Sequence, residues 1–189
     1  MNKIRNHTKE LVVLTILLAV AVSVVNAAVF VYQPLSITAK WNGPLVRFDG
    51  GTNAGNDDLG GETIEVTISS DGTEASITVH PCRRGRTYYK DILRVVNDRD
   101  EAVYVGFSVD TPFDDSAIIV AQLIVKNATT GVTIDTIDLK TGGTTWVPWT
   151  LGSGNELRID LRFEINSDKI GSDDASLSLI YSTVNELLP

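Results

Sequence analysis

Apolar and polar residues alternate along most of the chain after Glu62. In residues 62–69 isoleucine and valine recur at every second position, and residues 75–80 repeat this pattern after a Ser-Asp-Gly-Thr turn. Side chains two positions apart share a face of a β-strand, so this period predicts strands. The short turn between the two segments predicts that they form a β-hairpin.

The same alternation returns at short intervals towards the C-terminus. The further predicted strands are residues 88–97, 102–109, 117–127, 132–139, 144–151, 156–165 and 175–184. The first two of these flank Asp98-Arg99-Asp100, a turn sequence that predicts a second hairpin. Residues 113–124 are a helix candidate, but the β-branched Ile118, Ile119 and Val120 favour a strand there.

The strand predicted over residues 156–165 has one apolar side and one charged side. The apolar side consists of Leu157, Ile159, Leu161, Phe163 and Ile165, and the charged side of Arg158, Asp160, Arg162 and Glu164. This pattern is typical of a strand with one face in a core and the other in water. Many short strands separated by turns indicate an all-β fold. We expect a single jelly-roll-like β-sandwich over residues 62–189, with an N-terminal extension strand.

The first 27 residues have the layout of a secretory signal peptide. Basic residues precede an apolar run from Leu11 to Val25, and Val25-Asn26-Ala27 supplies the small residues of a cleavage site. We therefore expect residues 1–27 to be removed and the mature chain to be secreted, with the membrane met only during export. The alternative is a retained anchor. Residues 11–32 hold 22 residues without a charge, enough to span a bilayer core of about 30 Å.

The exported chain is strongly acidic. The full sequence has 16 basic and 24 acidic residues and a net charge of −8. Removal of residues 1–27 takes away three basic residues and one acidic residue, which leaves 13 and 23 and a net charge of −10. Phosphate backbones and anionic lipids repel such a chain, so we expect no nucleic-acid partner.

Residues that support catalysis or metal binding are scarce. His80 is the one histidine that follows residue 27, which excludes a zinc site with two histidines. No Gly-x-Ser-x-Gly sequence occurs, and we expect a structural role for His80 at the end of a strand. Acidic pairs such as Asp57-Asp58 and Asp173-Asp174 lie in predicted turns, but none belongs to an EF-hand sequence. We expect no enzymatic activity, cofactor, metal site or small-molecule substrate.

Residues 82–86, Cys-Arg-Arg-Gly-Arg, concentrate positive charge in this acidic chain. Cys82 is the one cysteine, so no internal disulfide can form. It is interpreted either as an ordinary loop cysteine or as a thiol that pairs with another chain. The arginines are a natural docking point for the acidic surface of a neighbouring copy.

Asn127-Ala128-Thr129 matches an N-glycosylation sequence and lies between two predicted strands. Such a position suits an exported surface protein, because glycans attach to exposed loops. We expect Asn127 to carry a glycan.

Residues 28–48 form an amphipathic segment ahead of the predicted sandwich. Its apolar face consists of Val29, Val31, Leu35, Ile37, Ala39 and Trp41. As a strand, residues 29–41 span roughly 43 Å, and burial of their large apolar side chains stabilises a complex by on the order of 10 kcal/mol. Pro34 has no N–H to donate, so this strand suits a sheet edge or a groove. We expect the six apolar residues to bind a groove on a protein partner.

The glycine-rich residues 49–61 follow this strand, with five glycines in thirteen residues. This composition is typical of a flexible linker, and a surface loop between two strands of one sheet is the alternative. Two arrangements stay open: the strand folds back into its own sandwich, or it completes the sandwich of the next copy. The second is a head-to-tail contact that does not close, and it builds a filament.

The run YYKDILRVVNDRDEAVYVGFSV at residues 88–109 follows a signal peptide and an early strand. In this it resembles archaeal bundling pilins and their relatives, the bacterial biofilm fibre protein TasA and camelysin. The resemblance implies a jelly-roll sandwich whose copies polymerise by donating an N-terminal strand, here residues 29–41. Camelysin relatives are often labelled metallopeptidases, but a chain with His80 alone gives that activity no support.

We therefore expect a structural subunit of an extracellular filament, a pilus or biofilm fibre. It polymerises with identical copies by donor-strand complementation. The alternative is a monomeric or membrane-anchored cell-surface domain that binds carbohydrate through exposed aromatic residues such as Trp146, Trp149 and Tyr88.

Overall fold

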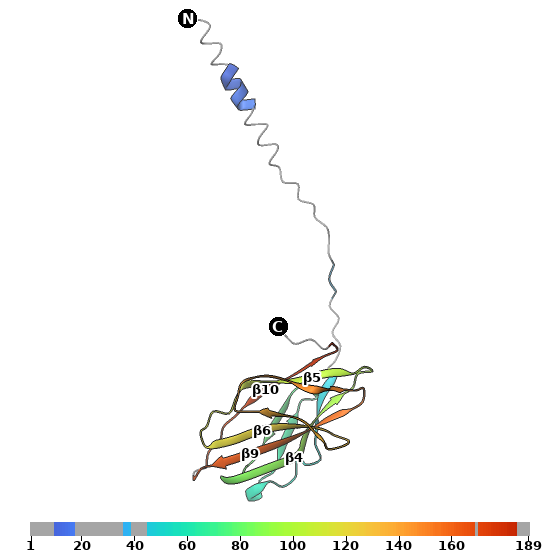
Figure 1. Cartoon of the computed structure of the whole chain (residues 1–189), viewed down its shortest axis with the longest axis vertical. Helices are drawn as coiled ribbons and strands as arrows, with labels where there is room; N and C mark the ends of the chain where they lie inside the picture. Colours follow the sequence, from blue (N-terminus) through green and yellow to red (C-terminus); the bar gives the residue numbers. More distant parts are fainter. Residues whose placement is uncertain (1–9, 18–35, 39–44, 169, 185–189) are drawn as a thin grey trace. The chain divides into compact units, whose positions relative to one another are not determined.

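The computed structural model describes residues 10–17, 36–38, 45–168 and 170–184 (Figure 1). It divides the chain into two units, Met1–Trp41 and Asn42–Pro189. In the first unit residues 10–17 are helical, and the rest of the predicted signal peptide lies outside the described residues. Among the described residues, no helix has both the length and the apolar character needed to cross a membrane.

The second unit is a β-sandwich of two antiparallel sheets and a small hairpin. The larger sheet has the order β1 (Val46–Gly50), β4 (Arg84–Asn97), β9 (Glu156–Asn166), β6 (Ile118–Asn127) and β7 (Thr133–Asp138). The smaller sheet has the order β10 (Ser176–Ser182), β5 (Val103–Thr111) and β8 (Gly143–Leu151), and β2 (Glu65–Ile68) pairs with β3 (Ala75–Thr78). The predicted all-β sandwich and its first hairpin are confirmed. The jelly-roll connectivity stays a prediction.

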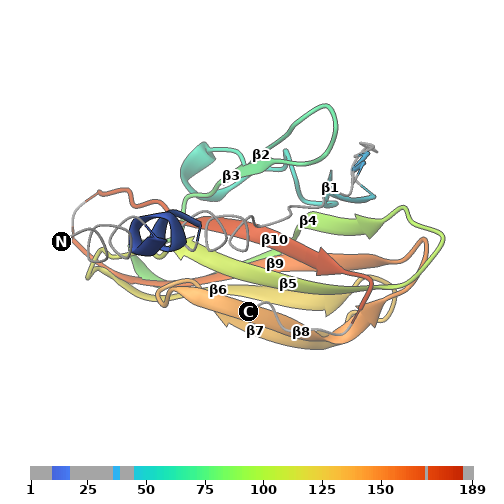
Figure 2. The same ribbon diagram turned by 90° about the horizontal axis from the view of Figure 1, so that it is seen from above.

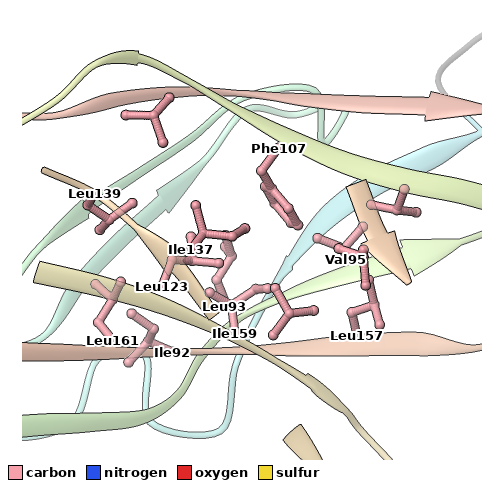
Figure 3. Close-up of a cluster of buried hydrophobic side chains, with 14 of the residues drawn as sticks. Ile92, Leu93, Val95, Phe107, Leu123, Ile137, Leu139, Leu157, Ile159 and Leu161 are labelled. Carbon is pink, nitrogen blue, oxygen red and sulfur yellow. The ribbon is translucent and has the colours of Figure 1, made fainter. Parts of the chain in front are cut away.

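The core lies between the two sheets. Alternate residues of β9, namely Leu157, Ile159 and Leu161, point into it together with Leu93 and Val95 of β4 (Figure 3). Phe107 enters the same core from β5 in the opposite layer. In β9 the apolar residues of the period-two pattern therefore form the core side of the strand.

The predicted pairing of residues 88–97 with 102–109 is wrong. β4 pairs with β1 and β9, whereas β5 pairs with β10 and β8 in the facing sheet. Asn97 fixes this crossing between sheets. Its buried Nδ2 donates to the carbonyl oxygens of Glu101 and Leu151 at 2.9 Å, and its Oδ1 accepts from the N–H of Arg99 at 3.0 Å. A turn sequence indicates that the chain reverses direction. It does not show whether the next strand pairs within the same sheet or crosses to the facing sheet, because both connections need the same turn residues.

The sandwich begins before Glu62, the start predicted for it. Residues 46–50 form β1, which pairs along its whole length with β4. Residues 51–61 follow β1 as a loop. The strands on either side of it, β1 and β2, lie in different sheets, whereas the surface-loop interpretation predicted strands of one sheet. The loop is held by hydrogen bonds from Gly51 N to the carbonyl oxygen of Ile92 and from Asn53 N to that of Asp91, at 3.1 and 3.0 Å.

Asp160 departs from the expectation that its side of β9 faces water. Its side chain is fully buried, because a bulge in β4 between Tyr89 and Leu93 brings backbone over it. Lys126 Nζ and Arg158 Nε lie 3.0 and 3.1 Å from its carboxylate oxygens. The outer face of the larger sheet therefore holds a buried charged cluster around one aspartate.

Candidate assembly edge

The predicted donor strand lies almost entirely outside the described residues. Of its six apolar residues, Val29, Val31, Leu35, Ala39 and Trp41 belong to that part of the chain. Ile37 is described, and its side chain is 83% exposed. A donor strand also needs a binding site on the folded unit.

Among the described strands, β10 lies at an edge of the smaller sheet, and its inner face is incompletely covered. Leu177, Leu179 and Tyr181 pair with the buried Val109, Phe107 and Val105 of β5, so these three side chains lie on the core side. Leu177 and Leu179 are only partly buried, and Tyr181 is 39% exposed. An inner-facing tyrosine with this exposure indicates that the core is not fully covered along β10.

The other edges of the two sheets carry features that oppose strand addition. β8 contains Pro148, which cannot donate to a ladder, and its pairing with β5 is irregular beside this residue. β7 carries Asp135 and Asp138. β1 carries Arg47 and Asp49, and its Phe48 N–H already donates to the carbonyl oxygen of Gly72 at 2.8 Å.

β10, with the sequence Ser-Leu-Ser-Leu-Ile-Tyr-Ser, carries no charge or proline, and the one irregularity in its pairing with β5 lies at its start, between Ser176 and Leu177. Natural sheets usually protect exposed edges with charges, proline or bulges, because a free edge pairs with other chains. Of the four edges of the two sheets, β10 is therefore the one suited to pairing with an additional strand.

The β2–β3 hairpin lies against β1: the carbonyl oxygen of Gly72, in the hairpin turn, accepts from the N–H of Phe48. In the view of Figure 2 it is drawn on the side of β10 away from β5. Its side chains Val66, Ile68, Ala75 and Ile77 pack against the core but stay partly buried. The smaller sheet thus has three strands and faces a five-stranded sheet. We refer to the free side of β10, with Leu177, Leu179 and Tyr181, as the β10 edge.

Asn127 is the last residue of β6, at the start of a turn. Its Oδ1 accepts hydrogen bonds from the N–H groups of Thr129 and Thr130, both at 2.9 Å. These bonds fix the side chain in the turn. Glycosylation at Asn127 stays a prediction.

His80 lies just beyond the end of β3, at the position expected for a structural role. Its N–H donates to the buried carboxylate of Asp58 at 2.7 Å, and its Nδ1 lies 3.2 Å from the same oxygen. Asp58 also accepts from the N–H of Leu59. Burial by itself raises the pKa of Asp58, but these backbone hydrogen bonds outweigh it and lower the pKa. The pair connects the loop of residues 51–61 to β3.

Cys82 is exposed and free, and the neighbouring arginines are engaged within the chain. Arg84 pairs with Asp168, Arg86 Nε lies 2.8 Å from a carboxylate oxygen of Glu164, and Arg83 Nη1 donates to the carbonyl oxygen of Asp168. The positive charge of this segment is thus largely neutralised locally. Its role as a docking point stays a prediction.

The acidic pairs are used in local loop contacts. The carboxylate of Asp173 accepts from the N–H groups of Asp114 and Asp115 at 2.9 and 2.8 Å, and these bonds lower its pKa. Within the described part of the chain, no group of three or more histidine, cysteine or acidic side chains is placed to hold a metal ion.

The three aromatic residues of the carbohydrate alternative do not form one surface. Tyr88 lies on β4 in the larger sheet, and its hydroxyl donates to Asp160. Trp146 and Trp149 lie on β8 in the smaller sheet, where Trp149 packs against the core. Trp146 covers Gly106, since a Cβ there would lie 3.0 Å from its ring.

The β10 edge was missed by sequence reasoning, although its signal is present. In residues 176–182 serine alternates with leucine or tyrosine except at Ile180, and the segment contains no charge and no proline. A comparison with protein-family models finds no match, and a search of curated proteins finds none either.

Proposed function

We propose that this protein is a structural, non-enzymatic subunit of an extracellular filament. Identical copies join by donor-strand complementation, in which residues 29–41 of one copy complete the sandwich of another. The observation that carries the proposal is the uncharged β10 edge, which no other described strand pairs with and whose inner-facing Tyr181 stays 39% exposed.

The sequence of the donor segment, residues 29–41, also suits this contact. Residues 29–41 alternate an apolar face with a more polar one, and the apolar face ends in Trp41. An added strand gains main-chain hydrogen bonds along the edge, and its alternate side chains enter the partly covered core. The acidic charge of the chain also disfavours binding to nucleic acid or anionic lipid.

Deletion of residues 28–41 from the mature protein tests the proposal. We expect full-length mature protein to form filaments visible by negative-stain electron microscopy, and the truncated protein to sediment as a monomer. A peptide of residues 28–41 should bind the truncated protein and raise its melting temperature, because the peptide completes the sandwich without polymerising it.

A matched control is a peptide in which Leu35 and Ile37 are replaced by aspartate. It keeps the length of the segment but places charge on the apolar face, so it should neither bind the truncated protein nor raise its melting temperature. If full-length mature protein stays monomeric over a wide concentration range, the proposed function is wrong.

A further inference from the structure

We infer that the β10 edge accepts residues 29–41 of a second copy in antiparallel orientation, so that subunits stack head to tail. This inference rests on the proposed function and adds where the strand binds, in which direction, and which ends of the subunits meet. It follows from the positions of the strand ends in the sandwich.

The sandwich has two ends, each marked by strand termini. Val46 pairs with Asn97, and Ser182 pairs with Tyr104 just after β5 begins; we call this the Asn97 end. Arg84 pairs with Asn166, and Ser176 pairs with Thr111; we call this the Asn166 end. The chain therefore enters β1 at the Asn97 end, and β10 runs towards that same end.

Antiparallel pairing is the arrangement that the sandwich itself uses. Every strand pair in the described sheets is antiparallel, including both pairs that β5 makes with β10 and β8. Antiparallel ladders are also slightly more stable per residue than parallel ones. A strand that is added to β10 with this geometry runs from the Asn97 end to the Asn166 end.

The chain is too short to make this pairing within one copy. A strand antiparallel to the whole of β10 ends with Trp41 near Ser176, whereas Val46 lies at the opposite end of the sandwich. Seven strand residues extend about 23 Å. The four residues between Trp41 and Val46 reach at most about 18 Å. Within one copy the segment would therefore have to pair parallel to β10.

A second copy removes this restriction. When the donor strand ends near Ser176 of the acceptor, the Asn97 end of the donor subunit comes to the Asn166 end of the acceptor. The same contact repeats at every subunit, and it joins unlike ends. Such a heterologous contact does not close on itself and extends as a filament.

Paired cysteines test the site and its direction. In a Cys82→Ser background, Ser36→Cys or Thr38→Cys is combined with one cysteine on the outer face of β10, at Ser176, Ser178, Ile180 or Ser182. After assembly and mild oxidation, denaturing gels without reductant separate cross-links between chains, which give a ladder, from cross-links within one chain. In two antiparallel strands, the residue numbers of two directly opposed residues add up to the same total at every pair. If Ser36→Cys joins Ile180→Cys, Thr38→Cys must therefore join Ser178→Cys.

Each result decides a separate point. A ladder with the constant-sum pattern is expected. A constant difference, in which Thr38→Cys joins Ser182→Cys instead, overturns the antiparallel orientation. Filaments that form without a ladder from any pair overturn the β10 edge but leave the proposed function standing. Cross-links confined to one chain, or a protein that never polymerises, overturn both.

A control pair uses the protected edge of the same sheet. Thr144 lies on β8 opposite Ser108, so Thr144→Cys presents a thiol on the same face of the sheet. Combined with Ser36→Cys, it should give at least tenfold less cross-linked product than the best β10 pair. An equal yield would show that collision between chains, and not pairing at β10, produces the ladder.

Discussion

The backbone N–H of Asp91 donates a hydrogen bond of 2.6 Å to Oδ1 of Asp160 on the neighbouring strand. Asp91 has a φ of 51°, a conformation rare for residues other than glycine, at the bulge of β4. The Tyr88 hydroxyl and Lys126 also bind the Asp160 carboxylate. One buried carboxylate thus holds an irregular backbone in place.

We predict that Asp160→Ala lowers the free energy of unfolding by roughly 3–5 kcal/mol. The substitution leaves the Asp91 N–H and the partly buried Lys126 and Arg158 without their shared acceptor. Urea unfolding followed by circular dichroism measures the change. The control is Glu164→Ala, which removes a more exposed pair with Arg86 and should cost no more than about 1 kcal/mol. Equal losses for the two variants would contradict this account.

Asn97→Asp should destabilise the crossing between the sheets. The asparagine Nδ2 donates to three carbonyl oxygens, those of Glu101, Leu151 and Gly152. A carboxylate of the same shape has no hydrogen to donate and faces these oxygens in a buried site, which costs at least about 3 kcal/mol. The melting temperature measures the loss. A variant as stable as the parent would show that the crossing does not depend on this side chain.

Gly51→Ala should be far more harmful than Gly50→Ala. A Cβ on Gly51 would lie 2.0 Å from the carbonyl oxygen of Asp91, so the backbone of the bulge would have to move. We expect a loss of about 1–3 kcal/mol or more. At Gly50 the nearest atom would be 3.9 Å away, and alanine should be neutral or stabilise by up to about 1 kcal/mol. Chemical denaturation of the two neighbouring variants makes the comparison.

Asp71 should titrate well below an ordinary aspartate. Hydrogen bonds from the Thr73 side chain, the Ser69 hydroxyl and the Thr73 N–H lower its pKa to about 2. Because the folded-state pKa of Asp71 lies below the unfolded value of about 3.9, its ionised carboxylate contributes fully to stability at pH values above about 3.9. The contribution is lost as the pH falls towards 2. Carboxyl NMR titration measures the midpoint, and Thr73→Val should move it upwards. An unchanged midpoint in that variant would contradict the assigned cause.

The strands after residue 62 follow from the alternation in the sequence because burial of one face imposes a period of two. β9 is the clearest case, with Leu157, Ile159 and Leu161 in the core and charged residues between them. The sequence pattern does not predict β1, whose five residues belong to the segments expected to precede the sandwich. Short edge strands have few residues over which an alternation can be recognised.

The partners of the strands could not be read from the sequence. Asp98-Arg99-Asp100 indicates a reversal, but the crossing to the other sheet depends on Asn97 contacts with Leu151, which lies 54 residues away. The burial of Asp160 depends in the same way on a bulge in another strand. The β10 edge cannot be recognised without the sheet order, since an uncharged strand is unprotected only if it lies at an edge.

The position of β1 has a mechanical consequence. The chain enters β1 at Val46 and runs along β4 through all five pairs of that strand. A pull on residues N-terminal to Val46, directed along the strand, therefore loads these hydrogen bonds together in shear instead of peeling them apart one at a time. The short edge strand that precedes a glycine-rich loop is thereby suited to bear tension.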